Sequence, residues 1–153
     1  MDQFKVFLDS DVVVSAFISQ TGASFEILNN SQIKKIISVT IKTEVNEVIK
    51  RLNISTPKNA FEQIKIIGLK LDKTRLVEKY LKYVFDKEDS HVVAGADKAG
   101  VKFLLTHNLK HYQTEKIKQS LGILVMRPGN YLQYLRNRNI SSKQFTDLTS
   151  ITS

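Results

Sequence analysis

Three acidic residues stand where the strands and helices of an α/β sheet would meet. Asp9 directly follows a short apolar run, and Glu44 lies in the first turns of a helix expected after the second strand. Asp89 lies in the first turn of the helix expected before a strand at 101–105. In a parallel sheet these positions fall on or near one edge, so the carboxylates could converge. Because converging carboxylates repel each other unless a cation neutralises them, the pattern predicts a Mg²⁺ or Mn²⁺ site suited to phosphate chemistry.

Each acid also has a purely structural explanation. Asp9 could simply end a strand and lead into a helix cap, although its place beside a buried sheet edge favours a functional role. Asp89 could be a first-turn acid that the helix dipole favours. Glu44 could be a surface residue of its helix, and Glu47, one turn later, competes for its role.

The order of apolar runs predicts strands that alternate with helices. Asp86 and Thr40 are expected helix caps, and the small residues Ala94, Gly95 and Ala96 predict a helix that packs closely on a sheet. The expected strands are 4–8, 36–39, 101–105 and 123–126, and the expected helices are 11–18, 24–28, 41–52, 57–71, 74–84, 86–100 and 131–138. This alternation implies right-handed crossovers between parallel strands, and therefore an α/β fold.

Length and composition favour one folded domain. The chain has 153 residues, of which 42% are hydrophobic, enough for one sizeable core over residues 1–140. Residues 141–153 form a Ser/Thr-rich tail. Without cysteine there is no thiolate metal site, and with only three histidines any metal must be held mainly by oxygen.

The charge balance is compatible with a polyanionic partner. Twenty-three Lys and Arg against fifteen Asp and Glu give a net charge of +8, which the solubility of a globular protein would also explain. The first residues lack a signal-peptide pattern, and no window approaches the ~20 apolar residues of a membrane span, so we expect a cytoplasmic protein.

Four segments of the chain resemble the motifs of PIN-domain nucleases, a family that includes the VapC-type toxins. The first is Phe7-Leu8-Asp9-Ser10-Asp11-Val12-Val13-Val14-Ser15-Ala16, and the second is Ser38 followed six residues later by Glu44. The third runs from Asp86 through Asp89 to Ala96, and the fourth is Leu104-Leu105-Thr106-His107-Asn108-Leu109-Lys110-His111-Tyr112. In the fourth motif the family often has aspartate at the position of Asn108 or His111, and this chain has neither.

The resemblance implies a three-layer α/β/α fold with a mostly parallel sheet, and a Mg²⁺- or Mn²⁺-dependent ribonuclease. In such an enzyme Asp9, Glu44 and Asp89 hold the cation, Asn108 assists from the outer shell, and a metal-activated water hydrolyses the RNA phosphodiester. Lys42, Lys87 and Lys110 neighbour the motifs and are candidates for binding flanking phosphates. The family also suggests a small antitoxin as partner, and a homodimer to which the helix with Tyr131, Tyr134 and Leu135 could contribute.

Two other functions fit parts of the sequence. The opening motif also resembles that of haloacid-dehalogenase-type phosphatases, in which Asp9 would be the nucleophile and Asp11 the general acid. That family needs an acidic pair after its Thr/Ser strand, whereas Asp86 and Asp89 precede Thr106 here. A degenerate PIN domain that binds RNA or a protein without cleavage is the second alternative, because the fourth motif is altered.

Overall fold

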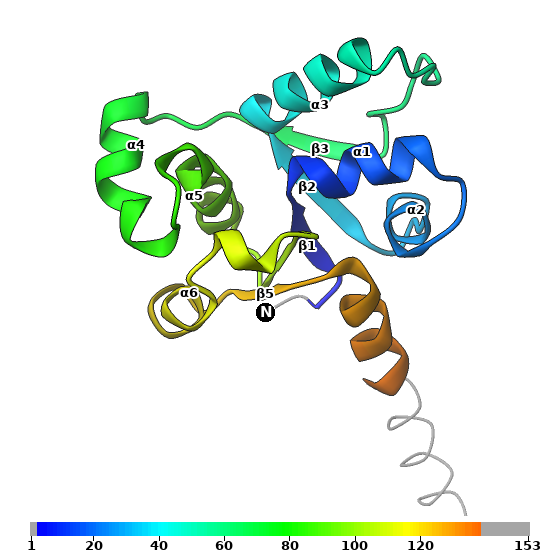
Figure 1. Ribbon diagram of the computed structural model, residues 1–153. Coiled ribbons are helices and arrows are strands. Elements are labelled where there is room, and N and C mark those ends of the chain that lie inside the picture. The colour runs from blue at the N-terminus through cyan, green and yellow to red at the C-terminus, as the bar shows by residue number, and fades with distance from the viewer. Residues whose placement is uncertain (1–2, 139–153) are drawn as a thin grey trace, which may run out of the picture.

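The centre of the protein is a five-stranded sheet in which every strand runs parallel to its neighbours (Figure 1). The computed structural model describes residues 3–138. Across the sheet the strand order is β3-β2-β1-β4-β5. The strands are β1 (Lys5–Leu8), β2 (Lys34–Ser38), β3 (Ile64–Ile67), β4 (Phe103–Leu105) and β5 (Leu124–Met126).

Helices cover both faces of this sheet. They are α1 (Ser10–Ile18), α2 (Ala23–Leu28), α3 (Val39–Arg51), α4 (Lys73–Tyr80), α5 (Ser90–Ala99) and α6 (Thr114–Leu121), followed by a last helix over residues 128–138. Right-handed crossovers from β1 to β2 to β3 place α1, α2 and α3 on one face (Figure 1). The chain then returns from β3 to β4, on the other side of β1, and the connections to β4 and β5 place α4, α5 and α6 on the other face (Figure 1). The expected three-layer α/β/α fold is therefore confirmed.

The chain reverses its direction across the sheet between β1 and β4. Phe7 pairs with Leu104 and Leu8 with Leu105, so the two strands end at the same level. The backbone N–H of Asp9 continues the ladder by donating to the carbonyl of Leu105 at 3.0 Å. In open α/β sheets the carboxyl edge at such a reversal is where ligands bind. The fold therefore brings residues after position 8 and after position 105 to the same place.

A glycine lets α5 pack directly on β1. The sequence predicted close packing from the small residues around Gly95, and a Cβ built on Gly95 would lie only 2.3 Å from Cζ of Phe7. The Phe7 side chain is fully buried, so it has little room to move. This close approach fixes the distance between the helix that follows Asp89 and the strand that precedes Asp9.

The helix expected over residues 57–71 is wrong. Residues 57–63 form turns, and Ile64–Ile67 are the edge strand β3, which pairs with β2. The apolar positions 61, 64, 67 and 71 suggested a helical period, but the three isoleucines within 64–67 favour an extended chain. Pairing with β2 then determined the outcome, because it satisfies backbone groups that the edge of β2 would otherwise leave open.

Three expected element ends also need correction. Thr40 does not cap α3, because the Ser38 hydroxyl accepts the Ile41 N–H at 3.1 Å and the helix already begins at Val39. Asp86 caps the short 3₁₀ turn η2 (Lys87–Asp89), and α5 begins only at Ser90. In addition, the last helix begins at Pro128, where the sequence suggested a turn before Tyr131. Proline fits a first helical turn because its missing N–H is not needed there.

The last helix packs its apolar side chains on the protein's own sheet. Tyr131 and Leu135 are buried, and the rings of Tyr131 and Tyr134 lie 5.1 and 5.2 Å from the Phe103 ring on β4. The stripe considered for a homodimer is therefore part of the core, and a homodimer stays a prediction. The Ser/Thr-rich tail at 141–153 lies outside the described residues. Within 3–138, no helix combines the length and apolar character that a bilayer crossing requires.

Gly95→Ala should destabilise the protein although alanine favours helices. We expect the free energy of unfolding to fall by about 1–3 kcal/mol, because the new methyl group overlaps the buried Phe7 ring. Gly129→Ala is the matched control, since Gly129 is also helical and a Cβ there meets no atom within 4 Å. Urea unfolding of both variants checks this, and equal stabilities would contradict it.

Candidate active site

Asp9 is the most buried carboxylate at the carboxyl edge of the sheet. It is the N-cap of α1, where its extended backbone lets Oδ1 accept the Ser10 N–H at 2.8 Å. Its other oxygen accepts the hydroxyl of Thr106 at 3.0 Å and that of Tyr112 at 2.6 Å. Only 8% of Asp9 is exposed. Asp9 therefore serves as a cap, as its structural explanation suggested, and at the same time lies where the site was expected.

Asp11 joins this edge to the fourth motif. Its carboxylate accepts the Asn108 side-chain amide at 2.8 Å and lies 3.2 Å from the His107 backbone nitrogen, which donates to it. The Thr106 hydroxyl lies 3.3 Å away, and because it has one proton it can donate to Asp9 or to Asp11, but not to both at once. Burial raises the pKa of Asp11 to about 6, and the neighbouring charge of Asp9 adds to the shift, while the bonds from His107 and Thr106 oppose it.

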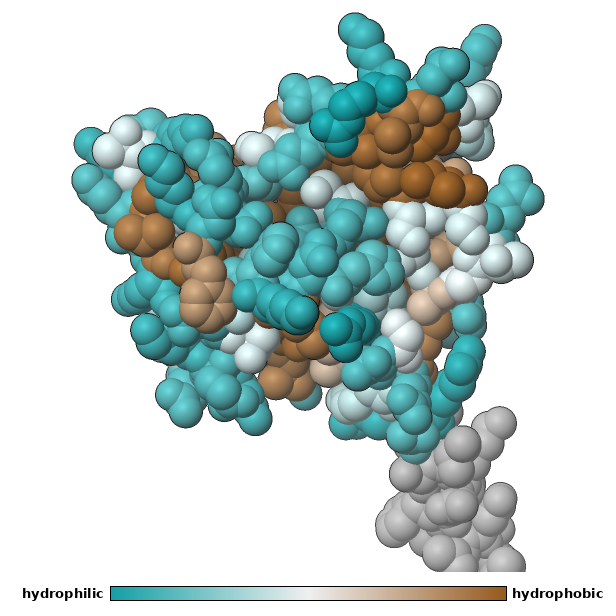
Figure 2. Space-filling model, viewed as in Figure 1, coloured by the Kyte–Doolittle hydropathy of each residue, from teal (hydrophilic) through white to brown (hydrophobic). Residues whose placement is uncertain are grey.

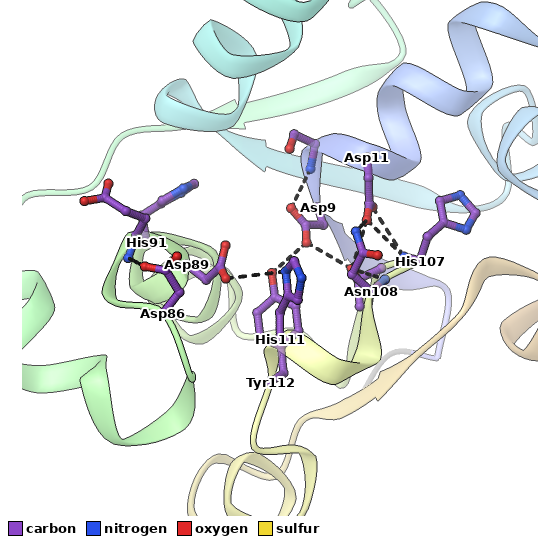
Figure 3. Close-up of polar contacts among 12 residues, drawn as sticks. Asp9, Asp11, Asp86, Asp89, His91, His107, Asn108, His111 and Tyr112 are labelled. Atoms are coloured by element: carbon purple, nitrogen blue, oxygen red, sulfur yellow. Dashed lines mark hydrogen bonds and ion pairs between the residues drawn. The ribbon is translucent and has the colours of Figure 1, made fainter.

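Asp89 is not used as a helix cap. It occupies the position before α5, but its side chain makes no capping hydrogen bond, and Asp86 caps the preceding turn instead. One Asp89 oxygen lies 3.5 Å from Nδ1 of His111. Burial raises the pKa of Asp89; His111 opposes this, and the charge of Asp9 adds to it. Asp89 is therefore no side-chain cap of α5, and its carboxylate faces the same edge as Asp9 (Figure 3).

Glu44 is held by a histidine on the neighbouring helix. Oε1 of Glu44 lies 2.6 Å from Nε2 of His91, the second residue of α5. Burial raises the pKa of Glu44, but the contact with His91 and a hydrogen bond from Ser10 outweigh burial, so the pKa lies below its ordinary value. Nδ1 of His91 is buried and has no hydrogen-bond partner among the described residues. No role was expected for His91, whose ring holds Glu44 in this structure.

The acids line one edge without forming a closed cage. Figure 3 shows Asp9 between Asp89 on one side and Asp11 on the other. In the described part of the chain, no three His, Asp or Glu side chains are grouped closely enough to hold a metal ion as they stand. Asp9, Asp11 and Asp89 also form no ion pair with a described Lys or Arg. This oxygen-rich donor set suits a hard cation, and Oε1 of Glu44 is already engaged by His91.

A hollow of ≈ 650 Å³ opens beside these acids. Glu44, Asp89, His91 and Lys87 line it together with apolar side chains such as Val39 and Leu76. In the same view as Figure 1, Figure 2 shows mostly hydrophilic atoms in the middle of the molecule and a hydrophobic area over α1 and α3. Because both charged and apolar side chains line the hollow, it can take a ligand that has both charged and apolar parts.

The three lysines named from the sequence lie in different surroundings. Lys87 lines the hollow, and Lys110 is exposed on the 3₁₀ turn η3 (Leu109–His111). The ammonium of Lys42 lies 5.2 Å from the centre of the Phe61 ring, a cation–π contact. Of the three, only Lys87 lines the hollow beside Glu44 and Asp89.

Sequence reasoning missed Asp11, Thr106 and Tyr112 as parts of the site. Asp11 had a role only in the phosphatase alternative, as general acid, yet its position at the start of a helix that follows a buried strand was a usable signal. Thr106 was named as part of the fourth motif but was given no partner. Nothing in the local sequence links Tyr112 to Asp9, because the contact depends on how the chain returns after β4.

Tyr112→Phe should destabilise the protein by removing one donor from the buried Asp9 carboxylate. We expect a loss of about 1.5–3 kcal/mol in the free energy of unfolding, the usual value of a hydrogen bond to a charged group. Tyr134→Phe is the control, since its hydroxyl meets only the exposed Arg138 at 3.2 Å. Urea unfolding in the presence of a chelator measures both, and similar small losses would contradict the role of Tyr112.

Asp11→Asn should change how stability depends on pH. Because the folded pKa of Asp11 is about 6 against an ordinary 3.8, the folded protein keeps a proton that the unfolded chain has released, and stability falls as pH rises through this window. The variant lacks this loss. Its free energy of unfolding relative to wild type should therefore increase between those two pH values, measured with chelator present, and a constant difference would contradict the shift.

Comparison with known protein families agrees with this geometry. The family model described as PIN domain matches residues 5–110, more than half of the chain and all four motif segments up to Lys110. No curated protein matches the chain. The matched segment contains β1, the acids at the carboxyl edge and the turn after β4, which are the parts that build the site. The chain belongs to the PIN-domain family, whose members are generally nucleases.

Proposed function

We propose that this protein is an endoribonuclease that depends on Mg²⁺ or Mn²⁺. The observation that supports it most is the group formed by Asp9, Asp11 and Asp89, which lie at the carboxyl edge beside the chain reversal with no Lys or Arg of the described residues paired to them. Repulsion between these carboxylates favours binding of a cation. A divalent ion supplies an activated water and neutralises charge on a phosphate when it is bound.

In this proposal Asp9, Glu44 and Asp89 are the ligands of the ion. Thr106 and Tyr112 orient Asp9 through their hydroxyl groups. The Asn108 amide holds Asp11 at 2.8 Å, so these two residues act together as an outer shell. Lys87 and Lys110, and Lys42 if it leaves the Phe61 ring, bind the phosphates that flank the cut.

A second candidate is a PIN domain that binds RNA or a protein without cutting. It is supported by the fourth motif, in which Asn108 donates to Asp11 and His111 lies against Asp89, where the family often has a further acid. It is also supported by the 2.6 Å pair between Glu44 and His91, which occupies one of the expected ligands. Metal-dependent cleavage separates the two candidates.

The resemblance to a family that includes the VapC-type toxins favours a biological role as the toxin of a toxin–antitoxin pair. A small antitoxin would then cover the hollow beside Glu44 and Asp89. If this is right, a small protein encoded next to this gene should form a stable complex with the chain and stop RNA cleavage. Cleavage that continues in such a complex would oppose the toxin role without affecting the nuclease proposal.

RNA cleavage is the direct test of the nuclease proposal. Wild-type protein should cut a mixed RNA pool with Mg²⁺ or Mn²⁺ and stop when a chelator is added. Asp9→Asn, Asp89→Asn and Glu44→Gln should each lower the rate by at least about a hundredfold, because even residues that only orient metal ligands contribute about 10–100-fold. Gel analysis of the products measures these rates.

Glu47→Gln is the matched control for Glu44→Gln, because Glu47 is an exposed residue one turn later on the same helix. It should leave the rate unchanged, and circular dichroism should show that all variants are folded. If metal neither supports cleavage nor raises the melting temperature of the wild type, the nuclease proposal is wrong. In that case RNA binding without cleavage would support the second candidate.

A further inference from the structure

Phe85 is an exposed aromatic residue beside the acidic edge. It is 68% exposed, the highest value among the large hydrophobic side chains of the described residues. The residues before it, Tyr83 and Val84, are buried, so the chain leaves the core at this point. Placing a phenylalanine ring in water is unfavourable, and nothing in the fold of residues 3–138 covers it.

Backbone contacts join the Phe85 segment to the site. Its backbone N–H donates to the carbonyl of His111 at 3.2 Å, and the His111 ring lies 3.5 Å from the Asp89 carboxylate. An isolated β-bridge between Val84 and Tyr112 holds the two segments together, and the Tyr112 hydroxyl donates to Asp9. Only three residues separate Phe85 from Asp89, which limits the distance between their Cα atoms to at most about 14 Å. A short stretch of single strand that meets the acids can therefore also reach Phe85.

Exposed charges of both signs surround Phe85: Asp86 caps the turn that follows it and Glu88 pairs with Lys73. Three exposed lysines are near Phe85. Two of them, Lys82 and Lys87, are close to it in the chain, and Lys110 directly precedes its hydrogen-bond partner His111. None of them forms an ion pair with a described carboxylate. Exposed aromatic rings among lysines are the usual means of holding unpaired bases, because the ring stacks on the base while the lysines meet the phosphates.

We propose that Phe85 is a stacking platform for an unpaired base of single-stranded RNA next to the scissile phosphate. This inference rests on the proposed nuclease function and adds to it a residue that contacts the substrate. A base within a duplex is already stacked on both sides, so the platform selects single strands or loops. The same segment, residues 85–89, would then hold a base at one end and a metal ligand at the other.

A protein partner would use this surface differently. Leu81, four residues earlier, is the nearest exposed apolar residue along the chain and is 46% exposed. An apolar protein contact would depend on both Leu81 and Phe85, and leucine could replace phenylalanine. Stacking on a base depends on the flat ring of Phe85 alone.

The test measures binding separately from cleavage. A fluorescein-labelled single-stranded RNA is titrated with full-length protein carrying Asp9→Asn, in Mg²⁺, and anisotropy gives Kd. We expect Phe85→Ala and Phe85→Leu to weaken binding about 5- to 150-fold, which corresponds to about 1–3 kcal/mol. Phe85→Tyr and Leu81→Ala should bind as the parent does, and a duplex of the same sequence should be insensitive to all four changes.

Phe85→Trp gives a second readout, because the chain contains no tryptophan. Its emission should be quenched by the single-stranded RNA but not by the duplex. Parent-like affinity of Phe85→Leu, or an unquenched tryptophan, would overturn the inference even if wild-type protein cleaves RNA. Conversely, aromatic-dependent binding by a protein that never cleaves RNA would reject the nuclease function and retain Phe85 as a base-binding residue.

Discussion

The pairing of β1 with β4 is the constraint on which the site depends. Its register places Leu8 beside Leu105, so the next residues of both strands, Asp9 and Thr106, meet at once through the 3.0 Å hydrogen bond between their side chains. The helices reverse faces at this pairing, which leaves the edge open. Gly95 keeps α5 close to Phe7, and therefore keeps Asp89 near Asp9. A shift of one residue between these strands would separate Asp9 from Thr106.

Neutral donors hold the buried Asp9 without cancelling its charge. A hydroxyl from Thr106, another from Tyr112 and the Ser10 N–H satisfy its oxygens, whereas a lysine would have neutralised them. Negative charge therefore stays at the edge of a chain whose net charge is +8. This arrangement costs stability in the absence of a cation, as the raised pKa values of Asp11 and Asp89 indicate. Functional sites commonly carry such a cost.

The sequence predicted most of the strands and helices but only part of the site. Buried strands such as Val6-Phe7-Leu8 stand out because they are continuously apolar, and their alternation with helices implies the parallel sheet. The strand at 64–67 was missed because its isoleucines also fit a helical period, and only pairing with β2 distinguishes the two. The placement of Asp9 follows from a strand end, and that of Asp89 from the start of a helix. The bond from Tyr112 to Asp9 joins residues 103 positions apart, and no local pattern reports it.

The altered fourth motif has a physical consequence that the sequence alone did not reveal. Where the family often adds an acid, Asn108 donates to Asp11 and His111 stands 3.5 Å from Asp89. Relative to that pattern the edge carries one negative charge fewer, and Asn108 and His111 each place a donor against an acid that remains. The three carboxylates Asp9, Asp11 and Asp89 can then stay together with less mutual repulsion than a fourth acid would cause. If a cation binds as proposed, the smaller number of anionic ligands would favour one ion over two.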